Sequence, residues 1–169
     1  YAFGSTFSSL QIGSANNNQS VTLSAPSTVN GPLSIYGLSA TIQGNVALTL
    51  SAAKLLAKAT GNISLSANVT TNNGDVILWS DSDNNNAGSI TLADNITVNS
   101  VNGSTASNLS GGGNIVFAGG ADNGANSGTA NDNIPDNYAQ SSTGLGLSLG
   151  TTEANLTQCY SGGGNIILN

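Results

Sequence analysis

A short phrase of one glycine, one small polar residue and two apolar residues recurs along this chain. In each copy the two apolar residues lie two positions apart, so both side chains point to one face of a β-strand. The glycine marks a turn, where we expect a positive φ that glycine adopts without steric cost. The phrase therefore predicts a turn followed by a strand, many times over. Its five copies span residues 61–65, 74–78, 88–92, 113–117 and 164–168.

The spacing of the marker glycines is short and irregular. Between Gly31 and Gly88 they follow one another at 13 to 17 residues, and the later intervals are 25 and 51 residues. So short an interval indicates that each phrase is part of a coil of chain, not a whole coil. Residues 51–60 hold the only stretch with helical propensity. Their leucines and alanines also fit a strand, which is the interpretation we favour.

Two all-β architectures fit this pattern. In a β-solenoid, equivalent residues of successive coils align, so one residue type recurs at one place. Asparagine after the turn is then expected to bond along the ladder. The self-similarity of the phrases favours a parallel β-helix (β-solenoid) that forms a single domain over residues 1–169, with one long acidic loop at 118–143 thrown out of the repeat. An antiparallel sandwich stays as the alternative, because Asn-Gly hairpin signals occur at four places.

Composition narrows the possible chemistry. The chain has 6% charged residues, two Lys or Arg, no His, one Cys and a net charge of −6. Without His there is no Ser-His or Cys-His nucleophile pair and no His/Cys zinc site, so we expect no enzyme. A carboxylate pair acting on a polysaccharide is the remaining enzymatic alternative. Two cations cannot neutralise a nucleic-acid backbone, and no apolar run is long enough for a membrane span.

Two acidic segments are candidate calcium sites. They alternate carboxylate and amide side chains, the oxygen ligands that Ca²⁺ prefers on flexible loops. Solvated acidic loops without a metal are the alternative interpretation. The candidate ligands are Asp81, Asp83 and Asn85 in the first segment, and Asp122, Asp132 and Asp136 in the second.

Two single residues are also conspicuous. The lone Cys159 is interpreted as a small buried residue, with an intermolecular disulfide as the alternative. Trp79 ends a predicted strand and is interpreted as a core ring, with a ligand platform as the alternative.

Several segments resemble the repeats of bacterial surface adhesins. They are Gly-Pro-Leu-Ser-Ile-Tyr-Gly at 31–37, the segment from Gly74 to Asn85, and Ser-Gly-Gly-Gly-Asn-Ile at 110–115 and again at 161–166. These segments are similar to the filamentous-haemagglutinin-like and related β-strand-repeat proteins, over roughly residues 20–169. The resemblance implies a right-handed parallel β-helix exposed outside the cell.

We therefore expect an extracellular or cell-surface structural β-solenoid, acting as the stiff rod of a bacterial adhesin or of a self-assembling filament. The repeat continues to Leu168 without the polar cap that solenoid ends need. We accordingly expect a segment of a longer protein, or a filament subunit that self-associates end to end. The alternative is a module that binds a host or surface glycan through the 118–143 loop with calcium.

Overall fold

The computed structural model describes residues 2–3, 8–16, 18–102, 110–124, 129–141, 144–151 and 155–169. These residues form seventeen short strands, and none of them is helical. The strands are β1 (Ala2–Phe3), β2 (Leu10–Ile12), β3 (Val21–Leu23), β4 (Ser27–Val29), β5 (Leu33–Gly37), β6 (Ala40–Ile42), β7 (Val46–Ser51), β8 (Leu55–Ala59), β9 (Ile63–Leu65), β10 (Val69–Asn72), β11 (Val76–Ser80), β12 (Ile90–Leu92), β13 (Thr97–Asn99), β14 (Ile115–Gly119), β15 (Leu147–Leu149), β16 (Gln158–Tyr160) and β17 (Ile166–Leu168).

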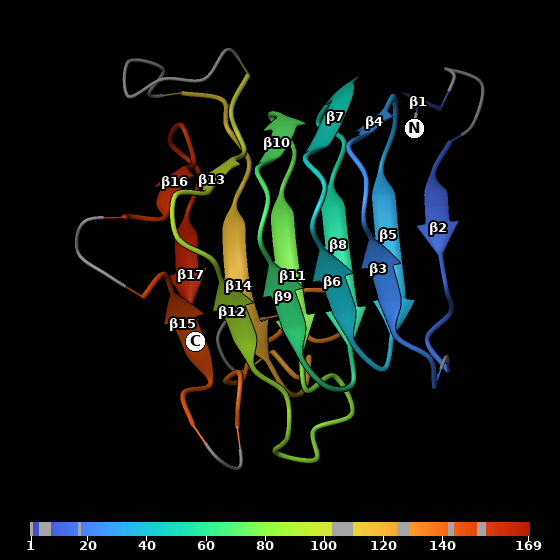
Figure 1. Cartoon of the computed structure of the whole chain (residues 1–169), viewed down its shortest axis with the longest axis vertical. Helices are drawn as coiled ribbons and strands as arrows, with labels where there is room; N and C mark the ends of the chain where they lie inside the picture. Colours follow the sequence, from blue (N-terminus) through green and yellow to red (C-terminus); the bar gives the residue numbers. More distant parts are fainter. Residues whose placement is uncertain are drawn as a thin grey trace.

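The strands form three parallel sheets, and each strand pairs with the strand three places further along the chain (Figure 1). One coil contains one strand of each sheet. The prediction of a parallel β-solenoid is thus confirmed. The sandwich alternative is wrong, because every pairing between the described strands is parallel. Sheet A contains β1, β4, β7, β10, β13 and β16; sheet B contains β2, β5, β8, β11, β14 and β17; sheet C contains β3, β6, β9, β12 and β15.

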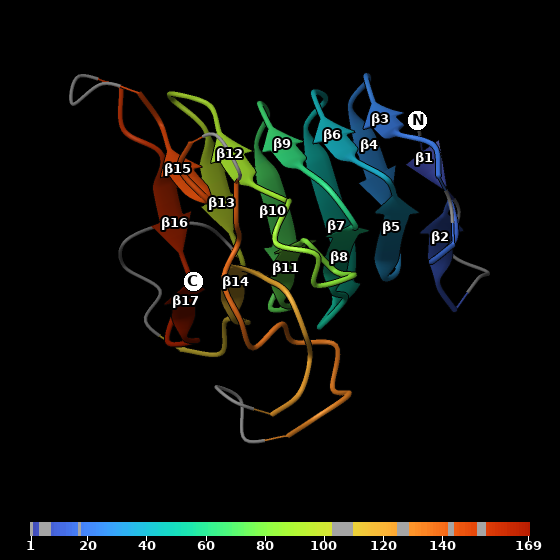
Figure 2. The same ribbon diagram turned by 90° about the horizontal axis from the view of Figure 1, so that it is seen from below.

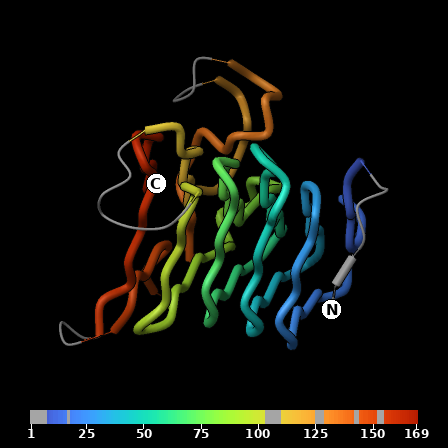
Figure 3. The backbone as a smooth tube through the Cα atoms, turned by 90° about the horizontal axis from the view of Figure 1, so that it is seen from above, coloured from blue at the N-terminus to red at the C-terminus, as the bar shows by residue number. Residues whose placement is uncertain are grey.

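The coils differ in length, although the strands stay in register. Leu10, Leu33, Leu55 and Val76 hold equivalent positions in sheet B, so a regular coil takes 21 to 23 residues. The next equivalents are Ile115 and Ile166, after 39 and 51 residues. The extra residues that the structure describes lie in connections between the strands, and those of the 118–143 loop lie along one side of the stack (Figures 2 and 3). Each Gly-polar-apolar phrase is therefore part of a coil, as its spacing predicts.

The interior is a thin apolar core made of aligned columns. In several strands alternate residues are buried, and the buried ones stack on their equivalents in the neighbouring coils. Leu55, Val76 and Ile115 form one such column and are fully buried. Each column removes branched apolar side chains from water at every level, which stabilises the stack along its whole length.

Residues 51–60 form a strand, as favoured. β7 ends at Ser51, the chain turns at Ala52 with a φ of 59°, and β8 begins at Leu55. β8 pairs with β5 on one side and β11 on the other. These two ladders outweigh the helical propensity of Ala, Leu and Lys.

The glycine of the recurring phrase is needed for a different reason than positive φ. No glycine that opens one of the five phrases has a positive φ. Instead the stacked backbones approach too closely for a side chain: a Cβ on Gly113 would lie 2.3 Å from the carbonyl carbon of Gly74. Several asparagines take the left-handed conformation at other turns, including Asn73 with a φ of 63° and Asn95 with a φ of 59°. The expectation of positive φ at these glycines is therefore wrong.

The polar residue of the phrase bonds along the stack, as predicted. Asn114 Oδ1 accepts the backbone N–H of Asn165 at 2.9 Å, one coil further on. At another corner Asn68 Oδ1 accepts the backbone N–H of Thr97 at 2.8 Å. These amides satisfy corner N–H groups that the sheet ladders do not reach.

Candidate functional site: a groove on sheet B beside the long loop

The outward-facing residues of sheet B change from polar to apolar along the stack. One outward column runs through Ser34, Leu56, Ile77 and Val116, and so passes from polar to apolar. Leu56, Ile77 and Val116 are buried, although they point away from the main core. Strands buried on both faces carry continuous apolar runs, and β11 and β14 do so. Something must therefore cover this part of the face.

The long loop is the cover. Ile134 packs against a second apolar cluster on this face. Trp79 belongs to that cluster, and its indole Nε1–H donates to the carbonyl of Gly120 at 2.8 Å. Gly88 and Gln140 exchange two backbone hydrogen bonds, of 2.6 and 2.8 Å, where the loop returns to the stack. The described parts of the loop therefore pack against sheet B. This loop is the insertion that the sequence predicts at 118–143.

Lys58 lies under this cover. Its Nζ is 3.3 Å from the centroid of the Trp79 ring, in a cation–π contact. Burial lowers the pKa of Lys58, and the negative charge of Asp122 on the loop opposes that effect. The lysine thus contacts Trp79 of the sheet through the ring and interacts with Asp122 of the loop by charge.

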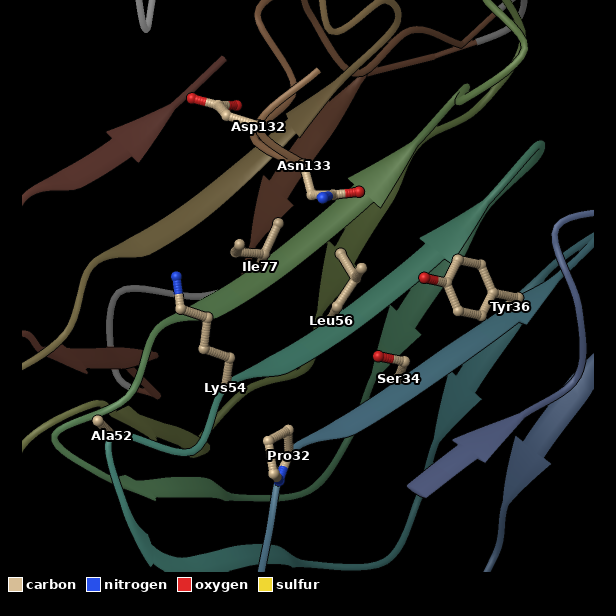
Figure 4. A pocket seen from close by; sticks show the side chains of 9 residues that line it. All are labelled: Pro32, Ser34, Tyr36, Ala52, Lys54, Leu56, Ile77, Asp132 and Asn133. Atoms are coloured by element: carbon tan, nitrogen blue, oxygen red, sulfur yellow. The ribbon is translucent and has the colours of Figure 1, made fainter. Parts of the chain in front are cut away.

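A groove lies where the cover ends. It has a volume of about 420 Å³ and extends over the outer face of β5, β8 and β11 (Figure 4). Leu56 and Ile77 form its floor, Tyr36 lies at one end and Lys54 at the other, and Asp132 and Asn133 of the loop form one wall. Its lining comprises Pro32, Ser34, Tyr36, Ala52, Lys54, Leu56, Ile77, Asp132 and Asn133.

Three charged groups lie in or beside the groove. Lys54 Nζ is 2.6 Å from Asp75 Oδ2, and the lysine side chain is 62% exposed while the aspartate is 14% exposed. Asp132 Oδ1 accepts the backbone N–H of Ile134 at 2.9 Å. With one cation against two carboxylates, the groove has a local charge of −1 when all three are ionised. Its apolar floor and polar wall are typical of small-molecule sites.

The first predicted calcium segment is a turn closed by one carboxylate. Asp81 is fully buried, and its carboxylate accepts the backbone N–H groups of Asn85 at 2.9 Å, Asn86 at 3.2 Å and Ala87 at 3.3 Å. Asp83 Oδ2 accepts the side-chain amide of Asn85 at 2.8 Å. The structure thus brings Asp81, Asp83 and Asn85 into one turn.

The second predicted calcium segment is organised in the same way. Asp122 accepts the backbone N–H groups of Asn131, Asp132 and Asn133 at 2.7, 3.3 and 2.9 Å. Asp136 is buried and accepts the backbone N–H of Asn123 at 2.8 Å. These carboxylates hold the two arms of the loop together.

These contacts pair the carboxylates of Asp81, Asp122 and Asp136 with backbone amides. Among the described residues, no three acidic or cysteine side chains come together in a group that could hold a metal ion. Calcium therefore stays a prediction from the sequence, and the observed role of these aspartates is to close turns.

The two conspicuous single residues lie in apolar surroundings. Trp79 is 3% exposed and is a core ring of the second cluster, as the sequence analysis interprets it. Cys159 is a free thiol that is partly buried against the main core, and burial raises its pKa. Its surroundings agree with the interpretation as a small apolar residue.

The groove itself is not evident from the amino-acid sequence. The signal for a covered face was present, because residues 76–79 and 115–118 are apolar without alternation. The local sequence does not indicate which loop residues would meet Tyr36 and Lys54, which lie 96 and 78 positions before Asp132 in the chain.

The described part of the chain contains no helix of the length and hydropathy needed to cross a membrane. Comparison of the sequence and structure with protein-family models, with curated proteins and with solved structures found no match.

Proposed function

We propose that this chain is a structural β-solenoid that forms part of a stiff extracellular rod, of the kind found in bacterial adhesins and surface filaments. The observation that carries the proposal is the in-register parallel stacking of three sheets through successive coils, with one irregularity between Thr70 and Asn72. Backbone hydrogen bonds between coils point along the stack, so all three sheets resist its bending and extension together.

The loops and the composition of the exterior also support a role as an extracellular rod. Enlarged coils carry the loops without interrupting any of the three sheets, since β11 and β14 stay paired over five residues on either side of the first enlargement. A rod of this kind can display loops on one side while its core continues. Its Ser-, Thr- and Asn-rich exterior, with few charged residues, agrees with a location outside the cell and with the resemblance to adhesin repeats.

The coil at the β15–β17 end suits association with another coil. Ile166 and Leu168 continue the two interior columns of sheet B, yet they are 45% and 44% exposed. At the other end, Leu10 and Ile12 belong to the same two columns and are partly exposed. Head-to-tail stacking of two copies would continue both columns. A head-to-tail contact that does not close produces a filament.

The test is the association of the 169-residue chain. We expect sedimentation velocity to show species that grow with concentration, and electron micrographs to show straight particles one coil stack wide. Leu168→Lys should abolish this growth, because it places a charge in the column that the next copy must cover. The matched control is Leu145→Lys, since Leu145 is 75% exposed and lies outside the paired strands. A wild-type chain that stays monomeric at high concentration would contradict end-to-end association.

A further inference from the structure

The groove on sheet B differs from the rest of the outer surface in being both apolar at its floor and bounded by the long loop. Its floor residues Leu56 and Ile77 are 9% and 4% exposed, and both line the open volume. Tyr36 is partly buried against the same apolar cluster as Leu56 and Ile77. A ligand in the groove would therefore lie on an aromatic and aliphatic surface that the backbone ladders hold rigid.

Polar groups surround this floor at its edges. The lining includes the hydroxyls of Ser34 and Tyr36, the amide of Asn133 and the carboxylate of Asp132. Hydroxyls both donate and accept hydrogen bonds, an amide offers two donors and an acceptor, and a carboxylate accepts. A ligand that matches this set carries several hydroxyls around a compact ring whose C–H groups form an apolar face. That description fits a saccharide, which can place its C–H face on Tyr36 and Leu56.

Charge narrows the class of saccharide. The ammonium of Lys54 is paired with Asp75 at 2.6 Å, and Asp132 adds a second carboxylate beside the groove. The groove is therefore negative, and the whole chain has a net charge of −6. A uronate, sialylated or sulfated sugar would meet like charge, which costs binding energy. A neutral sugar incurs no such penalty.

We propose that this groove binds a short neutral saccharide, with Tyr36 and Leu56 as the stacking surface and Asn133 and Asp132 as hydrogen-bonding partners. The inference rests on the proposed extracellular rod for access to glycans, but the groove lies on the side of the stack and not at its ends. The site needs no calcium, because the backbone N–H of Ile134 already holds the Asp132 carboxylate in place.

The test uses the labelled full chain on a printed array of neutral, N-acetylated, uronic-acid and sulfated oligosaccharides, in EDTA. We expect binding to neutral and N-acetylated members and none to the acidic ones. Tyr36→Ala and Asn133→Ala should each weaken binding to the best member by about tenfold or more, the loss typical of a central contact. Asn133 is exposed but has a φ of 64°, which alanine adopts only with strain. Asn133→Gly removes the same amide without that strain and should weaken binding as much as Asn133→Ala does.

Matched controls separate the groove from the rest of the surface. Tyr138 is a 61% exposed tyrosine on the same loop outside the groove, and Thr91 is exposed on the outer face of sheet C. Tyr138→Ala and Thr91→Ala should bind like the wild type. Binding to no neutral member, preference for acidic members, dependence on Ca²⁺, or unchanged binding by Tyr36→Ala and Asn133→Ala would each overturn the proposal. None of these outcomes affects sedimentation of the chain, so the rod and the groove can fail separately.

Discussion

The ammonium nitrogen of Lys58 lies 3.3 Å from the centroid of the Trp79 ring, and the two residues are paired neighbours on the outer face of sheet B. Lys58 lies in β8 and Trp79 in β11, one coil apart. The long loop closes over them through Gly120 and, by charge, Asp122. The outer face of β8 and β11 thereby determines where the 118–143 loop packs.

Replacing Trp79 with phenylalanine should loosen this contact. The change keeps a ring but removes the N–H that donates to the Gly120 carbonyl at 2.8 Å. A buried carbonyl that loses its donor costs about 1–3 kcal/mol, so we expect a decrease of that size in the free energy of unfolding by urea. Tyr138→Phe, at a 61% exposed position, should change it by less than about 0.5 kcal/mol. Equal stability of Trp79→Phe and wild type would show that the loop does not depend on this bond.

Lys58 should make the free energy of unfolding depend on pH in the alkaline range. Its pKa in the folded chain is lowered by burial from the ordinary value of 10.5, so between the two pKa values the unfolded chain binds more protons. Stability rises with pH wherever the unfolded state binds more protons. The contribution of Lys58 to stability should therefore increase from its lowered folded pKa up to 10.5, and stay constant below that range. Urea unfolding of wild type and Lys58→Met across pH 7 to 10.5 measures it; a difference that does not vary with pH would contradict the prediction.

The glycine of the recurring phrase should resist substitution where coils approach most closely. Gly113→Ala places a Cβ 2.3 Å from the Gly74 carbonyl carbon, which is backbone and cannot rotate away. We expect a loss of about 2–3 kcal/mol, at the upper end for an overpacked site. The control is Gly144→Ala, where the nearest atom is a serine hydroxyl 3.9 Å away. Thermal unfolding followed by circular dichroism should show a lower midpoint for Gly113→Ala alone.

Asp81 should be the most sensitive of the predicted calcium ligands. It is fully buried, and its carboxylate satisfies three backbone N–H groups. Asp81→Ala should cost about 2–4 kcal/mol in the free energy of unfolding, because buried donors lose their acceptor. Asp81→Asn should cost less, since it keeps one oxygen and tolerates the φ of 49°. The exposed Asp83→Asn serves as the control, and a similar effect of all three changes would argue against the turn-closing role.

Calcium binding can be tested on the 118–143 loop, which contains Asp122 and Asp136. The backbone amides that bond to Asp122 and Asp136 predict that the chain stays folded in EDTA. The sequence-based prediction of a calcium site requires in addition that millimolar Ca²⁺ raises the thermal midpoint, and that Asp122→Asn removes this gain. Mg²⁺ is the control, because it demands a more rigid octahedral site. An unchanged midpoint on addition of Ca²⁺ would contradict the site.

Several features of the fold could be predicted because they depend on local pattern. The apolar pairs two residues apart, such as Ile63 and Leu65, predict strands, and their recurrence after glycine predicts coils that stack. The strand at Leu55–Ala59 was ambiguous by propensity and was decided by its two ladders. The conformation of the marker glycines was mispredicted, because the clash that excludes a side chain comes from a neighbouring coil.

The sequence by itself determined the class of fold, the absence of histidine chemistry and the positions where asparagine bonds along the stack. Those properties follow from composition and from a repeat shorter than a coil. Only the tertiary structure decided that the long loop folds back, that its aspartates bind backbone amides, and that Tyr36 and Lys54 share a groove with Asp132 and Asn133. The physical reason is that these contacts join coils and loops far apart in the chain, where the register of the three sheets and not the local pattern sets which side chains meet.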